Sequence, residues 1–126
     1  ALRPGELIVA FVVPRRPGGV GLFRKVGPRR AQAISKVSFA AYTPPGRLGE
    51  TRVALGGVAP IPVRARAVEQ VIAAGGPRRD ALAALARDIA PIDDLRSTAA
   101  FRSAVAQNLL GLFLDALVAA GHALAP

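Results

Sequence analysis

Residues 22–42 read LFRKVGPRRAQAISKVSFAAY, and this stretch decides how the rest of the chain is arranged. It ends in an apolar run, residues 37–42, which a folded chain buries. It begins with four cations that lie close together in the sequence: Arg24, Lys25, Arg29 and Arg30. Together with Lys36, which precedes the apolar run, these cations place positive charge at the edge of a core. Such an edge can hold an anionic or electron-rich ligand.

The segments on either side of this stretch predict β-strands. Residues 6–13, ELIVAFVV, form an almost unbroken apolar run that Pro14 ends, which is typical of a buried strand. Residues 20–26 predict a second strand, which Gly27-Pro28 ends. Residues 36–43 and 50–55 predict two further strands that pair with each other. The intervening residues 29–34 allow a single helical turn.

Alternation within the last two strands predicts which side chains face the core. Period two puts one set of side chains on the buried face of the sheet: Val37, Phe39, Ala41, Val53 and Leu55. The other set points away from it: Ser38, Ala40, Tyr42 and Arg52. Gly56-Gly57 then lets the backbone turn tightly or approach another element closely.

After Pro62 the apolar period changes from two to 3.6, which predicts helices. We expect helices over residues 63–74 and 80–90, and a third that Ser97 or Thr98 caps and that runs to about residue 120. This third helix is apolar on more than one side, so it should be buried between two layers or pack on another chain. Strands followed by helices predict an α+β fold, an antiparallel sheet of three to four strands covered on one face by three helices.

Composition limits the class of protein. A chain of 126 residues that is 52% hydrophobic fits one domain with a real core and argues against disorder. No apolar stretch reaches the roughly 18 residues needed to span a membrane without a polar interruption. The absence of cysteine excludes disulfides, cysteine-ligated iron–sulfur clusters and thiolate zinc sites within this chain, and it fits a cytoplasmic protein.

The net charge of +9 raises the possibility of a nucleic-acid-binding module. However, the cations are dispersed, and only the group within residues 22–30 is dense. We therefore keep a basic interaction domain that binds nucleic acid or an acidic protein as the alternative function, and expect no nucleic acid as partner.

Classical catalytic groups are absent from the sequence. The single histidine, His122, lies four residues from the end of the chain, and no acidic or histidine residues have metal-ligand spacing. Asp93-Asp94 follows a proline and precedes a helix, which favours loop and capping roles. Lys25, near the end of an apolar strand, is different. Its stem should pack and hold the ammonium in one place, where it would stabilise negative charge on an electron-accepting ring. The alternative for Lys25 is a solvated basic edge.

Several motifs resemble one family. Lys25-x-Gly-x-Arg-Arg-Ala, followed by Ile-Ser-Lys-Val, resembles the start of the C-terminal domain of the FAD-binding subunit of molybdenum hydroxylases, the carbon monoxide dehydrogenase and xanthine dehydrogenase relatives. Residues 2–14 and 52–66 are similar to further segments of that domain. Residues 91–110 resemble its Asp-x-Arg-Ser-x-x-x-Tyr-Arg segment, with Phe101 where tyrosine is usual. The resemblance covers nearly the whole chain.

The resemblance implies a domain organisation and partners. Residues 1–19 would be a strand and linker from the preceding flavin domain, and residues 20–126 the flavoprotein C-terminal α+β domain. In such enzymes electrons pass from a molybdenum centre through iron–sulfur clusters to FAD and then to an acceptor. The implied partners are therefore two upstream FAD-binding lobes of the same subunit, a molybdenum-cofactor subunit and an iron–sulfur subunit. A purely structural lobe that docks these subunits is a further possibility.

The resemblance also implies cofactor-binding residues for FAD. Lys25 and Ile8 match positions that contact the flavin, and Arg29 and Gln32 match positions on its acceptor side. Relatives often have aspartate where this chain has Gln32, which puts a charge-dependent role there in doubt. Because the upstream lobes are missing, we expect the chain alone to fold without FAD and to be inactive. Residues 6–13 should then pack on the edge of the sheet or against a second copy in a homodimer.

Overall fold

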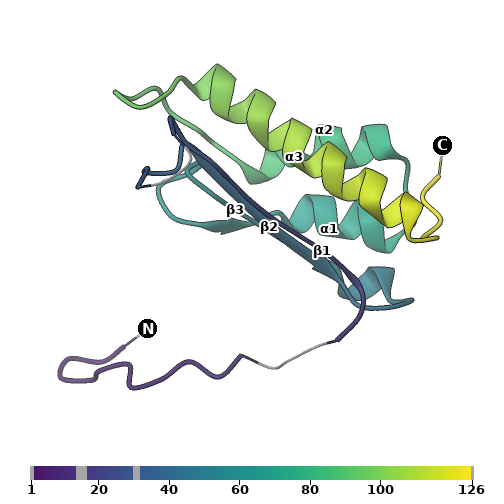
Figure 1. Ribbon diagram of the computed structural model, residues 1–126, viewed down its shortest axis with the longest axis horizontal. Helices are drawn as coiled ribbons and strands as arrows, with labels where there is room; N and C mark the ends of the chain where they lie inside the picture. The colour runs from purple at the N-terminus through teal and green to yellow at the C-terminus, as the bar shows by residue number, and fades with distance from the viewer. Residues whose placement is uncertain (1, 14–16, 30–31, 126) are drawn as a thin grey trace.

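The computed structural model describes residues 2–13, 17–29 and 32–125. Its described part contains a four-stranded antiparallel sheet with three α-helices on one face (Figure 1). The strands follow chain order across the sheet: β1 (Val20–Val26), β2 (Val37–Thr43), β3 (Arg52–Gly56) and β4 (Val63–Arg64). A short 3-10 helix, η1 (Leu48–Glu50), precedes β3, and the α-helices are α1 (Arg66–Ala73), α2 (Arg78–Asp88) and α3 (Ala99–Ala119). The predicted α+β fold is confirmed.

The sheet buries the side chains that the alternation predicts. β1 pairs with β2 from Val20 opposite Thr43 to Val26 opposite Val37. On β2 and β3 the helix-facing side chains are buried: Val37, Phe39, Ala41, Val53 and Leu55. In the described part of the chain no helix covers the opposite face, where Phe23 and Arg52 are exposed.

The core lies between this sheet and the layer of three helices. The ring of Phe39 on β2 is fully buried and lies 6.2 Å from the buried ring of Phe113 on α3, measured between ring centroids. α3 buries one face against the sheet and α2, whereas Leu112 and Val118 on its other face are more than half exposed. The sequence predicted burial of this helix between two layers or packing on another chain. The described domain covers one face of α3, and packing on another chain stays a prediction.

α3 is also the one helix in the described residues that has the length and composition to cross a membrane. The sequence, read only for uninterrupted apolar runs, did not indicate this. Nearly half of its most apolar window is buried inside the domain. That burial is what the central helix of a packed α+β core requires.

Side chains from neighbouring loops and helices cap the helix starts. Thr98 caps α3 as predicted, since its Oγ1 accepts a hydrogen bond from the backbone N–H of Phe101 (3.1 Å). α1 begins at Arg66 and not at residue 63, because Val63–Arg64 pairs with β3. The first amides of α1 are capped from α2: the Asp88 carboxylate accepts hydrogen bonds from the N–H groups of Ala67 and Val68, both at 3.1 Å.

Asp88→Ala is expected to lower the free energy of unfolding by about 0.5–2 kcal/mol, the usual cost of a lost helix cap. The carboxylate satisfies two amides that have no partner within α1 and is favoured by the positive end of the helix dipole. Urea denaturation would measure the change. Asp115→Ala is the control, because the exposed Asp115 makes only a surface ion pair with Arg78. Equal effects of the two substitutions would contradict the capping role.

The prediction of a strand over residues 6–13 is wrong for the described chain. These residues are extended without sheet pairing and run away from the domain (Figure 1). Their apolar side chains are exposed, with Leu7 at 87% and Val9 at 96%. A strand that is apolar on both faces needs a layer of structure packed against each face. The outer edge of β1 offers hydrogen-bond partners to such a strand, but it does not offer the two covering layers. Packing of this segment against a second copy stays a prediction.

Candidate functional site

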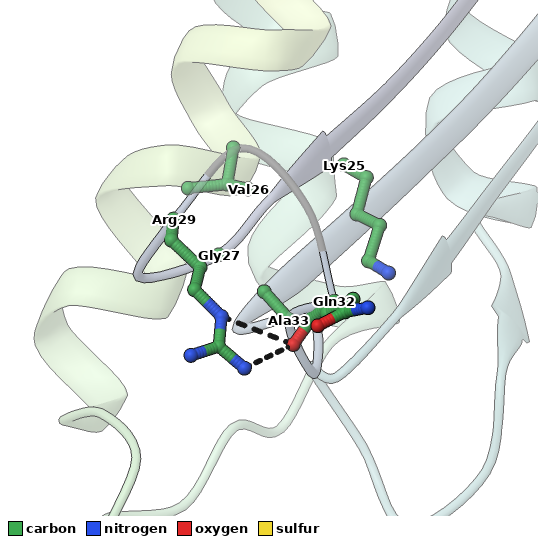
Figure 2. Close-up of a pocket in the computed structure, with 6 residues that line it drawn as sticks. All are labelled: Lys25, Val26, Gly27, Arg29, Gln32 and Ala33. Carbon is green, nitrogen blue, oxygen red and sulfur yellow. Dashed lines mark hydrogen bonds between the residues drawn. The ribbon is translucent and has the colours of Figure 1, made fainter.

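A pocket of about 530 Å³ lies where β1 leads into the loop that connects it to β2 (Figure 2). It is lined by the end of the strand and by the loop: Lys25, Val26, Gly27, Arg29, Gln32 and Ala33. A second pocket of about 520 Å³ shares Arg29, Gln32 and Ala33 with the first and extends to Lys36, Leu95 and Arg96. The two pockets form one basic depression around the loop.

Hydrogen bonds fix both the base and the tip of this loop. At the base, the backbone N–H of Lys36 donates to the carbonyl oxygen of Val26 (2.7 Å). At the tip, the Arg29 guanidinium donates from Nε (3.1 Å) and Nη2 (2.6 Å) to the carbonyl oxygen of Gln32, as the dashed lines in Figure 2 show. Gln32 has a positive φ of 49°, which turns its carbonyl toward Arg29. The described loop residues form no helical turn.

Lys25 brings a positive charge to the pocket, but its stem is not packed as predicted. It lies opposite Ser38 in the β1–β2 register, on the face of the sheet that the helices leave uncovered. The side chain is therefore exposed. No carboxylate among the described residues forms an ion pair with its ammonium, so the charge is available to a ligand or to another protein surface.

Gly27 allows the two ends of the loop to approach closely. A Cβ atom at this position would lie 3.1 Å from the Cβ of Ala33, and both residues line the same pocket. The lining thus combines cationic groups with small apolar groups. Pockets of this size that mix apolar walls with a few polar groups are typical of small-molecule sites.

The structure brings together three of the residues predicted to bind the cofactor. Lys25, Arg29 and Gln32 line one pocket, whereas Ile8 lies 55% exposed on the N-terminal segment and does not line it. Among the other cations of residues 22–42, Arg24 donates a hydrogen bond to the carbonyl oxygen of Phe23 and does not line this pocket. Arg30 lies outside the described residues. Contact with a cofactor stays a prediction for all four site residues.

Arg102, at the start of α3, is a neighbour of the site that sequence reasoning missed. Its side chain is buried, and Nη1 donates to the carbonyl oxygens of Lys36 (3.0 Å) and Gly57 (2.7 Å). Nη2 donates to Oδ2 of Asp94 (2.7 Å). One signal for this role was available in the sequence. Arg102 lies four residues before Ala106 and therefore on the same, buried face of an apolar helix.

The Asp93-Asp94 pair has the loop and capping roles that its position predicts. Asp93 accepts a hydrogen bond from the first amide of α3, at Ala99. The hydrogen bond from the N–H of Arg96 is the main cause that holds the pKa of Asp94 below its usual range. Desolvation opposes this shift, and the Arg102 guanidinium and the N–H of Ser97 add to it. Asp94 is therefore ionised at neutral pH and pairs with Arg102.

Comparison with known proteins places this chain among flavoprotein subunits. The family of CO dehydrogenase flavoprotein C-terminal domains matches residues 23–117. Over 75 residues, 60% of this chain, the sequence is 47% identical to the aldehyde oxidoreductase FAD-binding subunit PaoB of Escherichia coli (strain K12). The match spans 23% of the length of PaoB.

Solved structures share the fold. A chain of the carbon monoxide dehydrogenase from Hydrogenophaga pseudoflava superposes with a TM-score of 0.65 at 24% identity, over 84% of this chain and 39% of that one. A chain of quinoline 2-oxidoreductase from Pseudomonas putida 86 superposes with a TM-score of 0.62 at 20% identity, over 82% and 39%. The family match covers well over half of the sequence, and it confirms the resemblance that the motifs indicate. The chain belongs to the CO dehydrogenase flavoprotein C-terminal domain family.

Proposed function

We propose that the chain is the C-terminal lobe of the FAD subunit of a molybdenum hydroxylase-type oxidoreductase. There it completes the flavin site and docks subunits for electron transfer from iron–sulfur clusters through FAD to an acceptor. The observation that carries the proposal is the pocket in which Lys25, Arg29 and Gln32 meet, inside the segment that matches the family. The similarity to PaoB, an FAD-binding subunit, supports the choice of cofactor.

The pocket lining fits one end of a flavin. FAD, when bound, supplies a ring that accepts electrons and passes them on. The Lys25 ammonium has no ion-pair partner among the described residues, so it can stabilise the negative charge that such a ring gains. Gly27 lets the chain approach Ala33 closely, so the wall of the pocket beside Lys25 carries no large side chain at this position. The exposed fraction of Ile8 is consistent with a contact made only when other parts of the subunit surround it.

The lining does not fit the whole of FAD. A pyrophosphate needs several backbone N–H groups or a helix N-terminus pointed at it. The described pocket residues offer cations beside a loop carbonyl that already accepts from Arg29. The proposal therefore requires the two upstream FAD-binding lobes for the rest of the site. We further propose a molybdenum-cofactor subunit and an iron–sulfur subunit as partners, and a cytoplasmic location.

The proposal is tested by comparing this chain with the full-length subunit. The chain alone is expected to be folded and colourless, because it lacks the groups for the pyrophosphate, and the full-length subunit is expected to bind FAD. Removing residues 20–126 from the full-length subunit should weaken FAD binding at least tenfold, measured by fluorescence titration. An unchanged affinity after that removal would contradict a role in the flavin site, and a yellow isolated chain with stoichiometric FAD would show that the lobe is complete by itself.

The alternative, a basic interaction domain, is favoured by the second pocket, where Lys36 and Arg96 add positive charge beside Arg29. Such a domain would bind nucleic acid or an acidic protein with an affinity that falls steeply as salt rises. Retention on immobilised nucleic acid at physiological salt, with no effect of Lys25→Ala on flavin binding, would favour the alternative.

A further inference from the structure

We propose that Arg102 is the positioning residue of the loop between β1 and β2, whose described residues are 27–29 and 32–36, and that it sets the positions of Arg29 and Gln32 in the pocket. The inference rests on the proposed function, because it assigns the loop to the cofactor. It goes beyond that function by naming a buried residue of α3 that reaches the pocket through the backbone carbonyl of Lys36.

The contacts of Arg102 lie where the loop joins the sheet. Lys36 is the last residue of the loop, and its backbone N–H is bonded to Val26 at the other end of the loop. The carbonyl of the same residue accepts from Arg102 Nη1 at 3.0 Å. The backbone of Lys36 is thus hydrogen-bonded both to β1 and to α3. A shift of the Arg102 guanidinium therefore moves the base of the loop.

The Lys36 carbonyl is held from a second side by Gly57. Gly57 has a φ of +77°, and a Cβ atom there would lie 2.5 Å from the Lys36 carbonyl oxygen. Its own carbonyl accepts from Arg102 Nη1 at 2.7 Å. The side chain of Lys36 is also held, because its Nζ lies 5.0 Å from the centroid of the Phe101 ring. Of the two uses predicted for Gly56-Gly57, a tight turn or a close approach, the close approach is present at Gly57, where the backbone lies against Lys36.

The hydrogen bonding of Arg102 fits a positioning role better than a stabilising one. Its Nε is buried and has no hydrogen-bond partner among the described residues. A buried charge with an unpaired N–H is costly, and well-packed apolar residues often replace buried ion pairs without loss of stability. Arg102 thus contributes little to the free energy of folding, whereas its hydrogen bonds to two carbonyl oxygens define a specific geometry. Asp94, held by the amides of Arg96 and Ser97, fixes the guanidinium from the opposite side.

The test uses the full-length subunit with Arg102→Met, which keeps the volume of the side chain, and Arg102→Lys, which keeps the charge. The control is Leu117→Ala, because Leu117 is fully buried toward the other end of α3 and far along the helix from the loop. Hydrogen–deuterium exchange of the loop amides reports loop position without depending on FAD, and FAD titration reports its consequence. Arg102→Met should speed exchange at Lys36 and its loop neighbours at least tenfold and weaken FAD binding at least tenfold. Arg102→Lys should recover part of both effects.

Leu117→Ala should leave loop exchange and FAD affinity within about twofold of wild type after correction for global stability. If Arg102→Met does not fold, Gly57→Ala provides the second route, since it displaces the Lys36 carbonyl while Arg102 is intact. Gly57→Ala should loosen the same loop amides and weaken FAD binding in the same direction.

Three results would overturn the inference. Loop exchange that stays unchanged in Arg102→Met would show that Arg102 does not position the loop. A loosened loop with normal FAD affinity, while Lys25→Ala and Arg29→Ala weaken it, would leave the proposed function standing and remove Arg102 from it. If neither Lys25→Ala nor Arg29→Ala changes FAD affinity, the proposed function fails and this inference fails with it.

Discussion

Phe113→Ala is expected to lower the free energy of unfolding by about 3–5 kcal/mol, the usual cost of deleting a buried aromatic ring. The ring is fully buried on α3, and its centroid lies 6.2 Å from that of Phe39, with the rings inclined at 56°. Through this contact α3 and the inner strand β2 share one core. Urea denaturation with linear extrapolation would measure the loss.

Phe101→Ala is the matched control, because Phe101 lies on the same helix but is 42% exposed. Its ring contacts Lys36, a cation–π interaction worth about 0.5–1 kcal/mol at an exposed site. We therefore expect a loss several-fold smaller than that of Phe113→Ala. Similar losses at the two positions would mean that the sheet and α3 do not share the single core described above.

The sequence was sufficient to predict β1, β2 and β3 and the order of the helices, but not β4. β1 occupies Val20–Val26, the range predicted for the strand before Gly27-Pro28, because a Gly-Pro pair cannot continue a sheet ladder. The period-two pattern identified Phe39 and Val53 as core residues, because one face of an antiparallel sheet must be buried. Helix starts were less accurate, as for α1, because β4 takes up two residues that also fit a helical period.

Residues 6–13 show that a local sequence pattern alone is insufficient to predict a strand. Its composition is that of a buried strand, but a strand also needs neighbours on its edges and faces, and the described part of this chain does not provide them. The curated and solved relatives are far longer than this chain, which spans 23% of PaoB and 39% of the H. pseudoflava subunit.

The site was predictable only where its residues are close in sequence. Lys25, Arg29 and Gln32 lie within eight positions, and they line one pocket. The resemblance to the family predicts a contact with the flavin for each of them. The contact from Arg102 to Lys36 joins residues that are 66 positions apart, and no periodicity relates them. The packed stem predicted for Lys25 was wrong for a similar reason, because the helices cover only the opposite face of the sheet.

Lys25→Ala in the full-length subunit is expected to lower the reduction potential of the flavin by about 30 to 65 mV. A hydrogen bond to a charged group is worth roughly 1.5–3 kcal/mol. For a two-electron couple, about 1.4 kcal/mol corresponds to 30 mV. The sign follows from charge, because the ammonium stabilises the negative charge of the reduced ring and its loss disfavours reduction. Equilibrium dye titration would measure the potential, and FAD affinity should fall in the same samples.

Arg24→Ala is the matched control for this prediction. Arg24 adjoins Lys25 in β1 and is also exposed, but it does not line the pocket, so its removal changes the net charge equally without removing a pocket group. Lys25→Arg should keep most of the potential and lose part of the affinity, because the planar guanidinium retains the charge and occupies the space differently. Neither side chain belongs to the buried core, so the free energy of unfolding should change little in all three variants. Equal shifts in Lys25→Ala and Arg24→Ala would indicate a diffuse effect of net charge, and no shift in either would identify Lys25 as part of a solvated basic edge.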